Sequence, residues 1–250
     1  MNESLRPPVP GPRPESDFSH EIFLMTDTMY RRPWALRLLR NFGSVMPHDL
    51  ESSWRAAQIT ASVVTEMRQQ DPDIFPTYDD LDTLILGGAL QDIGRGIEPP
   101  EIQTEVYTNG ERWRDDPNAR QWDVVRRHPV RSRDLIMEAT GNPESGVAYN
   151  VAQIVYLHHA LKRKNPYPEV EEGFLDQLPP IVKEGIGIVA AVDVAEAISA
   201  NFKGRTRPYV KGEEFTGRSL SEVLQGEIRV DQRIADLVAK QTLRYKAINL

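Results

Sequence analysis

Apolar residues recur at helical spacing along almost the whole chain, and this periodicity constrains the fold more than any other feature. In each segment below, apolar positions are three and four residues apart, which places them on one face of an α-helix. Convincing alternation of apolar and polar residues, the pattern of a strand, is absent. The sequence therefore predicts an all-α fold, a bundle of about eight to ten helices. The expected helical segments are 19–29, 33–45, 52–70, 79–94, 119–140, 150–162, 181–202, 219–228 and 231–248.

The composition favours a cytoplasmic protein. Of the 250 residues 40% are apolar and 27% charged, as in soluble globular proteins, and no apolar run is long enough to cross a membrane. The start of the chain has no apolar core of signal-peptide type. The absence of cysteine excludes disulfides and thiolate chemistry. A net charge of -7 argues against non-specific nucleic-acid binding, so we expect neither a DNA nor a membrane partner.

Three parts are expected along the chain. Residues 1–17 form a disordered tail, because residues 1–16 hold five of the 19 prolines and almost no apolar residues. Residues 18–45 form an N-terminal helical extension, whose apolar residues indicate either capping of the bundle or a dimer contact. Residues 46–250 form the main helical domain, in which Pro129 marks a kink or a break between two helices.

Five residues that can carry chemistry sit in or at the ends of strongly apolar segments. Asp92 follows an apolar run, and Asp193 lies inside another, where a carboxylate is costly to bury unless it is paired or bound to a metal. His128 follows WDVVRR, and His158 and His159 follow AQIVYL. Imidazole nitrogen together with carboxylate oxygen suits iron, manganese or zinc. Taken singly, each residue also has a structural explanation, such as a hydrogen-bonded core Asp or a His at a helix end.

The order of five short elements resembles the HD-GYP family, the bacterial metal-dependent phosphodiesterases that hydrolyse cyclic di-GMP on an all-helical HD-superfamily fold. The resemblance runs from about Ser52 to about Val238. The matching elements are QDIGRGIEPPEI (91–102), WDVVRRHP (122–129), HHALKRKNPYP (158–168), AAVDVAEAI (190–198) and Arg-Pro-Tyr (207–209).

The first metal site of the family has lost ligands in this chain. In the family an early histidine, the histidine of the His-Asp pair and the last aspartate hold that metal. Ser52 and Gln91 stand at the two histidine positions, which leaves Asp92 and Asp193. His48 lies four residues before Ser52 and is the one histidine near that position.

The second metal site keeps all of its ligands. The resemblance implies one transition metal ion, of iron, manganese, zinc or nickel, and no second metal. The residues that the resemblance assigns to metal binding are Asp92, His128, His158, His159 and Asp193.

Arg95 stands where the family has a lysine that contacts the phosphate, and arginine can bind a phosphate bidentately. With Asp92 it forms the expected catalytic pair. If a cyclic dinucleotide is the ligand, the basic residues expected to contact its phosphates are Arg95, Lys162, Arg163, Lys164 and Arg207.

Three functions remain open at this point. One is a regulatory or binding protein of cyclic di-GMP signalling with weak or no phosphodiesterase turnover, since loss of one metal removes at least roughly 3 kcal/mol of transition-state stabilisation. Another is an active metal-dependent phosphohydrolase. The last is a metal-free helical interaction module. The expected ligand of the first two is a cyclic dinucleotide or related nucleotide, with a protein partner or a homodimer also open.

Overall fold

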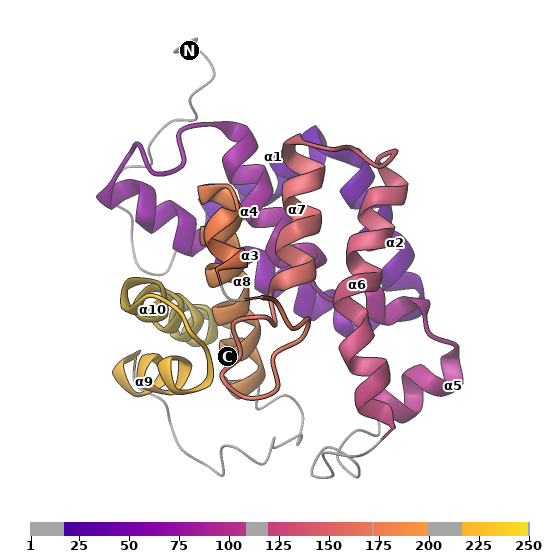
Figure 1. Cartoon of the computed structure of the whole chain (residues 1–250). Coiled ribbons are helices and arrows are strands. Elements are labelled where there is room, and N and C mark those ends of the chain that lie inside the picture. The colour runs from indigo at the N-terminus through magenta and orange to yellow at the C-terminus, as the bar shows by residue number, and fades with distance from the viewer. Residues whose placement is uncertain (1–17, 109–119, 172, 200–216, 250) are drawn as a thin grey trace.

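The computed structural model describes residues 18–108, 120–171, 173–199 and 217–249 (Figure 1). These residues form ten α-helices and no strand, so the predicted all-α fold is confirmed. No described helix combines the length and apolar character needed to span a bilayer. The tail 1–17 and the predicted ligand contact Arg207 lie outside the described residues. The α-helices are α1 (Ser19–Arg31), α2 (Pro33–Val45), α3 (Pro47–Gln70), α4 (Tyr78–Leu90), α5 (Pro100–Gln103), α6 (Gln121–Ala139), α7 (Gly146–Leu157), α8 (Pro180–Ser199), α9 (Gly217–Glu227) and α10 (Gln232–Asn249).

Short helical turns complete the chain between the longer helices. A 3-10 turn, η2 (Ile93–Ile97), follows α4, and a π-helical turn, η3 (Thr104–Thr108), follows α5. Another 3-10 turn, η5 (Phe174–Gln177), precedes α8. The helix α6 continues through Pro129, so the structure excludes a break between two helices there.

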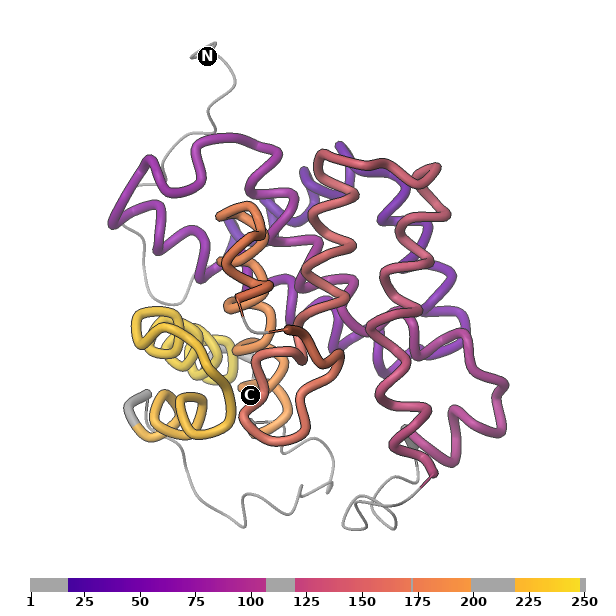
Figure 2. The backbone as a smooth tube through the Cα atoms, viewed as in Figure 1, coloured from indigo at the N-terminus to yellow at the C-terminus, as the bar shows by residue number. Residues whose placement is uncertain are grey.

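The centre of the bundle is built from helices that are apolar on nearly every side. Helix α4 buries every residue from Leu81 to Leu90 and packs against α3, α7 and α8. A helix that is apolar all round is stable only when other helices surround it. Helices α9 and α10 cover one side of this core, and helices α2 and α6 cover the opposite side (Figure 2). The loop after α7 runs beside the turn between α9 and α10, where Lys162 and Ile228 form a single β-bridge.

The extension 18–45 is packed onto the bundle. Helices α1 and α2 contact α3 and α4, and their apolar faces bury residues such as Met29, Leu39 and Phe42. At the centre of this contact the carboxylate of Asp82, from α4, is fully buried. It accepts hydrogen bonds from Thr28 Oγ1 at 2.9 Å, Arg31 Nε at 3.1 Å and Arg32 Nε at 2.8 Å. The extension therefore caps the bundle and supplies the partners of a buried charge.

Candidate metal centre

Three histidines from two helices meet in the interior. His128 lies within α6, while His158 and His159 directly follow α7. The ring centroids are 3.9 Å apart for His158 and His159, 5.1 Å for His128 and His159, and 5.4 Å for His128 and His158. One ligand atom from each residue lies within 4.8 Å of the others. All three residues are at most 2% exposed. We call these three residues the histidine cluster.

Backbone carbonyls set the tautomer of two members of the cluster. His128 Nδ1 lies 2.6 Å from the carbonyl oxygen of Val125, and His158 Nδ1 lies 2.7 Å from that of Val155. A carbonyl oxygen only accepts hydrogen bonds, so each Nδ1 must carry the proton and donate. The lone pair of each ring is then on Nε2. This is the arrangement in which a histidine held by its other ring nitrogen presents a nitrogen to a metal.

Asp92 adjoins the cluster at the start of η2. Its Oδ1 lies 3.2 Å from His128 Nε2 and 2.7 Å from Arg95 Nη2. The close approach of η2 and α6 depends on Gly94, because a Cβ there would lie 2.3 Å from the carbonyl oxygen of His128. Ser132 also joins the two elements by accepting from the Gly94 amide at 2.9 Å. The glycine thus brings the Asp92 carboxylate within reach of the histidine.

Asp193 lies at another edge of the cluster. In α8 its Oδ2 is 3.6 Å from His159 Nδ1, and the side chain is 15% exposed. If His159 bound a metal through Nε2, its Nδ1 would point away from the metal and toward the Asp193 carboxylate. A carboxylate behind a ligating imidazole is a common way to orient it. The structure thus brings all five predicted metal residues together, with the three histidines at the centre and the carboxylates beside His128 and His159.

The electrostatics of the cluster favour the ligating forms of its members. Burial, with the neighbouring His128, lowers the pKa of His158 to about 4. Burial and the adjacent His158 hold the pKa of His159 well below its usual value. Burial alone would raise the pKa of Asp92, but the positive charge of Arg95 opposes burial, and that pKa is lowered. At neutral pH two neutral imidazoles and an ionised carboxylate are therefore expected, the protonation states that bind metals.

The unpaired ring nitrogens provide a test of whether the cluster fits a metal. Among the described residues, no hydrogen-bond partner exists for the buried Nε2 atoms of His128, His158 and His159. Each buried, unsatisfied polar atom costs about 1–3 kcal/mol. A shared tetrahedral metal about 2.1 Å from each nitrogen would place the ligand atoms about 3.4 Å apart, so atoms that now lie within 4.8 Å of one another would need to approach by up to about 1.4 Å. The residues fit one transition metal, and Asp92 supplies an oxygen ligand beside them.

Ser52, which stands at a metal-ligand position only by the resemblance described above, belongs to a group of another kind. Ser52 Oγ accepts from Arg55 Nη2 at 2.8 Å, and Arg55 Nε donates to Glu196 Oε1 at 2.7 Å. Burial raises the pKa of Glu196 to about 7, although Arg55 opposes this shift. Gln91 is 3% exposed, and its Oε1 has no hydrogen-bond partner among the described residues. We call Ser52, Arg55 and Glu196 the arginine group.

His48 is the one further histidine that lies near Ser52 in the sequence. It is exposed in the first turn of α3. No described group of three or more possible ligands includes it.

The predicted phosphate-binding residues are placed unequally around the cluster. Arg95 lies next to Asp92, and its Nη1 is 3.8 Å from Asp49 Oδ1. Lys162 Nζ lies 3.5 Å from the hydroxyl of Tyr167. Arg163 points elsewhere, since its Nε donates to the carbonyl of Gln225 in α9 at 2.8 Å. Lys164 is exposed. Of the four predicted phosphate-binding residues that the structure describes, Arg95 and Lys162 thus lie close to the cluster.

Sequence reasoning assigned no role to Tyr167, which covers part of the cluster. Its ring centroid is 4.4 Å from that of His159 and 6.2 Å from that of His128. The tyrosine of the PYP segment was the available signal, because it keeps the family's spacing from His158. Asp49 and Glu196 were also missed. No pattern in the sequence distinguishes these two carboxylates from other helical acidic residues.

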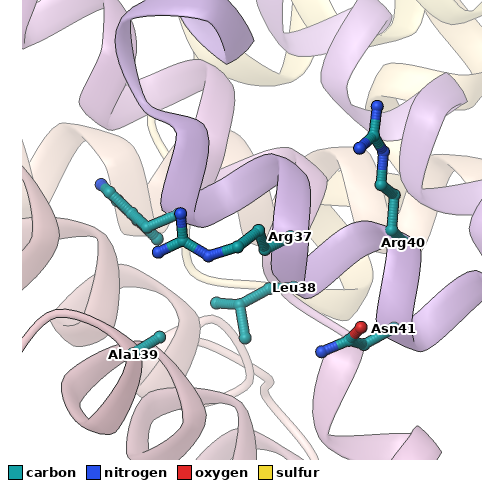
Figure 3. A pocket seen from close by; sticks show the side chains of 6 residues that line it. Arg37, Leu38, Arg40, Asn41 and Ala139 are labelled. Atoms are coloured by element: carbon teal, nitrogen blue, oxygen red, sulfur yellow. The ribbon is translucent and has the colours of Figure 1, made fainter.

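A surface groove lies away from the cluster, between α2 and the end of α6. It is lined by Trp34, Arg37, Leu38, Arg40, Asn41 and Ala139. In Figure 3, Arg37, Leu38 and Asn41 point to the side on which Ala139 lies, whereas Arg40 points away from them. Ala139 is 11 residues beyond His128, about 16 Å along the helix. The groove is therefore separate from the candidate metal centre.

Comparison with known proteins adds no assignment, since no protein-family model, curated protein or solved structure matches this chain.

Proposed function

We propose that this chain is an HD-GYP-like protein of cyclic-dinucleotide signalling that binds one transition metal ion and hydrolyses its ligand weakly or not at all. One observation carries the proposal: three buried imidazoles converge with partnerless Nε2 atoms beside an ionised aspartate. A buried arrangement of this kind is costly unless a cation completes it. The motif order that resembles the HD-GYP family supplies the ligand class.

The residues of the chain have separate roles in this proposal. The histidine cluster and Asp92 hold the metal, which when bound would polarise a phosphoryl oxygen and acidify a water. Arg95 touches Asp92 and is 19% exposed at its side chain, so its guanidinium can also contact a phosphate. Lys162, beside Tyr167, supplies a second positive charge near His159.

Binding is favoured over turnover because the arginine group offers no second metal site. The nucleophile of a two-metal phosphodiesterase is a hydroxide that bridges both ions. Here Ser52 and Glu196 are engaged by the guanidinium of Arg55 instead. Losing the second ion costs at least roughly 3 kcal/mol of transition-state stabilisation, or about a hundredfold in rate.

A one-metal phosphohydrolase is the second candidate. It is favoured by Arg95, whose guanidinium lies 2.7 Å from the Asp92 carboxylate and thus provides a fixed positive charge beside the metal. Turnover of cyclic di-GMP by the metal-loaded protein separates the two candidates. Hydrolysis within about a hundredfold of a two-metal enzyme would establish the hydrolase.

The deciding experiment is the metal content of the purified protein, measured beside a His158→Ala, His159→Ala double variant. We expect about one metal per chain, lost in the variant, because two of the three imidazoles are removed. His48→Ala is the matched control, since this exposed histidine lies outside the cluster and its loss should leave the metal content unchanged. An absence of metal after growth in iron- and manganese-rich medium would refute the proposal and leave a helical interaction module.

A further inference from the structure

We propose that Pro129 is a positioning residue for the metal ligand His128. Because proline has no backbone N–H, it leaves the carbonyl of Val125 free to bind the imidazole, and this bond fixes which ring nitrogen faces the cluster. The inference rests on the proposed metal site.

The position of Pro129 in α6 makes its effect specific. In an α-helix the N–H of each residue donates to the carbonyl four residues earlier, so the partner of residue 129 would be Val125. Proline cannot make this bond, and in a helix interior it costs about 3 kcal/mol. Helix α6 nevertheless continues through it to Ala139. The helix thus contains one carbonyl without its usual amide donor, one turn before His128.

His128 takes up this carbonyl. Its Nδ1 lies 2.6 Å from the oxygen of Val125, and His128 is 1% exposed, so the imidazole itself is shielded from water. The bond requires the proton on Nδ1, which leaves the Nε2 lone pair, 3.2 Å from Asp92 Oδ1, on the side of the cluster. The carbonyl thereby selects both the tautomer and the ring orientation.

His158 shows the same relation without a proline. Its Nδ1 also binds the carbonyl three residues earlier, that of Val155. Helix α7 ends at Leu157, so Val155 is among the last four carbonyls, which have no amide donor within the helix. One ligand therefore uses a carbonyl released by a helix end, and the other a carbonyl released by a proline. The shared element is the released carbonyl.

The proposal predicts opposite changes in two properties of a Pro129→Ala variant. Restoring the N–H gives Val125 its helical donor, so the helix should gain stability. This amide then competes with the ring of His128 for the Val125 carbonyl, which weakens the bond to Nδ1 and gives the ring access to the other tautomer, whose protonated Nε2 cannot bind a metal. Loss of such an orienting contact weakens metal binding about tenfold to a hundredfold.

Three measurements on the full chain test the inference. Thermal unfolding of the metal-free protein should show Pro129→Ala to be as stable as the wild type or more so. Zinc affinity, by competition with a chelator, should fall by about tenfold to a hundredfold. Nitrogen NMR of the imidazoles in the metal-free protein should show a protonated Nδ1 for His128 in the wild type and a changed signal in the variant.

Pro33→Ala is the matched control, because Pro33 occupies the first position of α2, where a helix needs no N–H. It should leave both zinc affinity and the His128 signal unchanged.

Two results would overturn the inference. One is a His128 ring in the metal-free wild type whose Nδ1 carries no proton, which needs no variant to observe. The other is an unchanged His128 signal in folded Pro129→Ala. If neither protein binds zinc, the proposed function fails, but the tautomer still decides the role of Pro129.

Discussion

The histidine cluster and the arginine group lie close enough for charges in one to shift a pKa in the other. They differ in whether their buried polar atoms have hydrogen-bond partners within the protein. The pKa of Glu196 responds to both Asp92 and Asp193, so the two regions share one electrostatic environment. In the histidine cluster, the Nε2 atoms of three imidazoles have no acceptor or donor among the described residues. In the arginine group, Arg55 supplies a positive charge to Glu196 and a donor to Ser52.

The difference shows two ways in which neighbouring buried polar groups can be arranged in one fold. A buried carboxylate needs a positive partner, which can be a metal or a guanidinium. Arg55 provides such a partner at one position, with no requirement for an ion from solution. Among the described residues, the Nε2 atoms of the cluster have no such partner, and this is why we propose that a metal completes it.

The largest expected difference between the two regions is in metal affinity, when one carboxylate in each region is replaced by an amide. We expect Asp92→Asn to weaken metal binding by more than about a hundredfold, because it removes the anionic ligand. Glu196→Gln should change the affinity by less than about threefold, since Glu196 is bound to Arg55. Competition titration with a chromophoric chelator measures both. Equal losses in the two variants would show that the regions form one site.

Placing histidines at the two positions that the resemblance assigns to the first metal should make the arginine group bind metal as well. In the Ser52→His, Gln91→His double variant, we expect a second metal per chain, bound about tenfold more weakly than the first because Arg55 remains nearby. Elemental analysis after dialysis gives the stoichiometry. Ser52→Ala is the control and should keep about one metal. A folded double variant that still holds one metal would count against the resemblance on which the first site rests.

The smallest expected effect is a difference in pH dependence. Burial raises the pKa of Glu196 from its ordinary value of 4.5 to about 7, so between these values the folded state keeps a proton that the unfolded state has released. The contribution of Glu196 to folding stability should therefore fall by about 2 kcal/mol as the pH rises from 5 to 7.5, while the lowered pKa values of His158 and His159 act in the opposite direction in wild type and variant alike. Glu196→Gln should remove this fall. Urea unfolding of both metal-free proteins at several pH values tests it, and parallel curves would disprove the assignment.

The helices were predictable from the sequence because their signal is local. The apolar spacing in residues 181–202 and 231–248 depends only on the segment itself, and helices were found at both. Asp92, His128, His158 and Asp193 could be proposed as one site because the order of their motifs matches a known arrangement.

The partners of the arginine and carboxylate side chains were not predictable, because they are set by packing between distant segments. Arg55 and Glu196 are separated by 141 positions in the sequence. The bond from Arg163 Nε to the Gln225 carbonyl likewise joins residues 62 positions apart. The break considered at Pro129 was also wrong. Local propensity disfavours proline inside a helix, but tertiary packing can override it, and α6 continues through this residue.

The burial of Asp82 makes the extension a requirement for the fold. Its carboxylate draws its donors from Thr28, Arg31 and Arg32, all of which lie before residue 46. A chain that began at α3 would expose the apolar face of the bundle and leave a bare negative charge at the former contact. In evolutionary terms, the first two helices cannot be exchanged for another N-terminal module unless that module brings its own cation to Asp82.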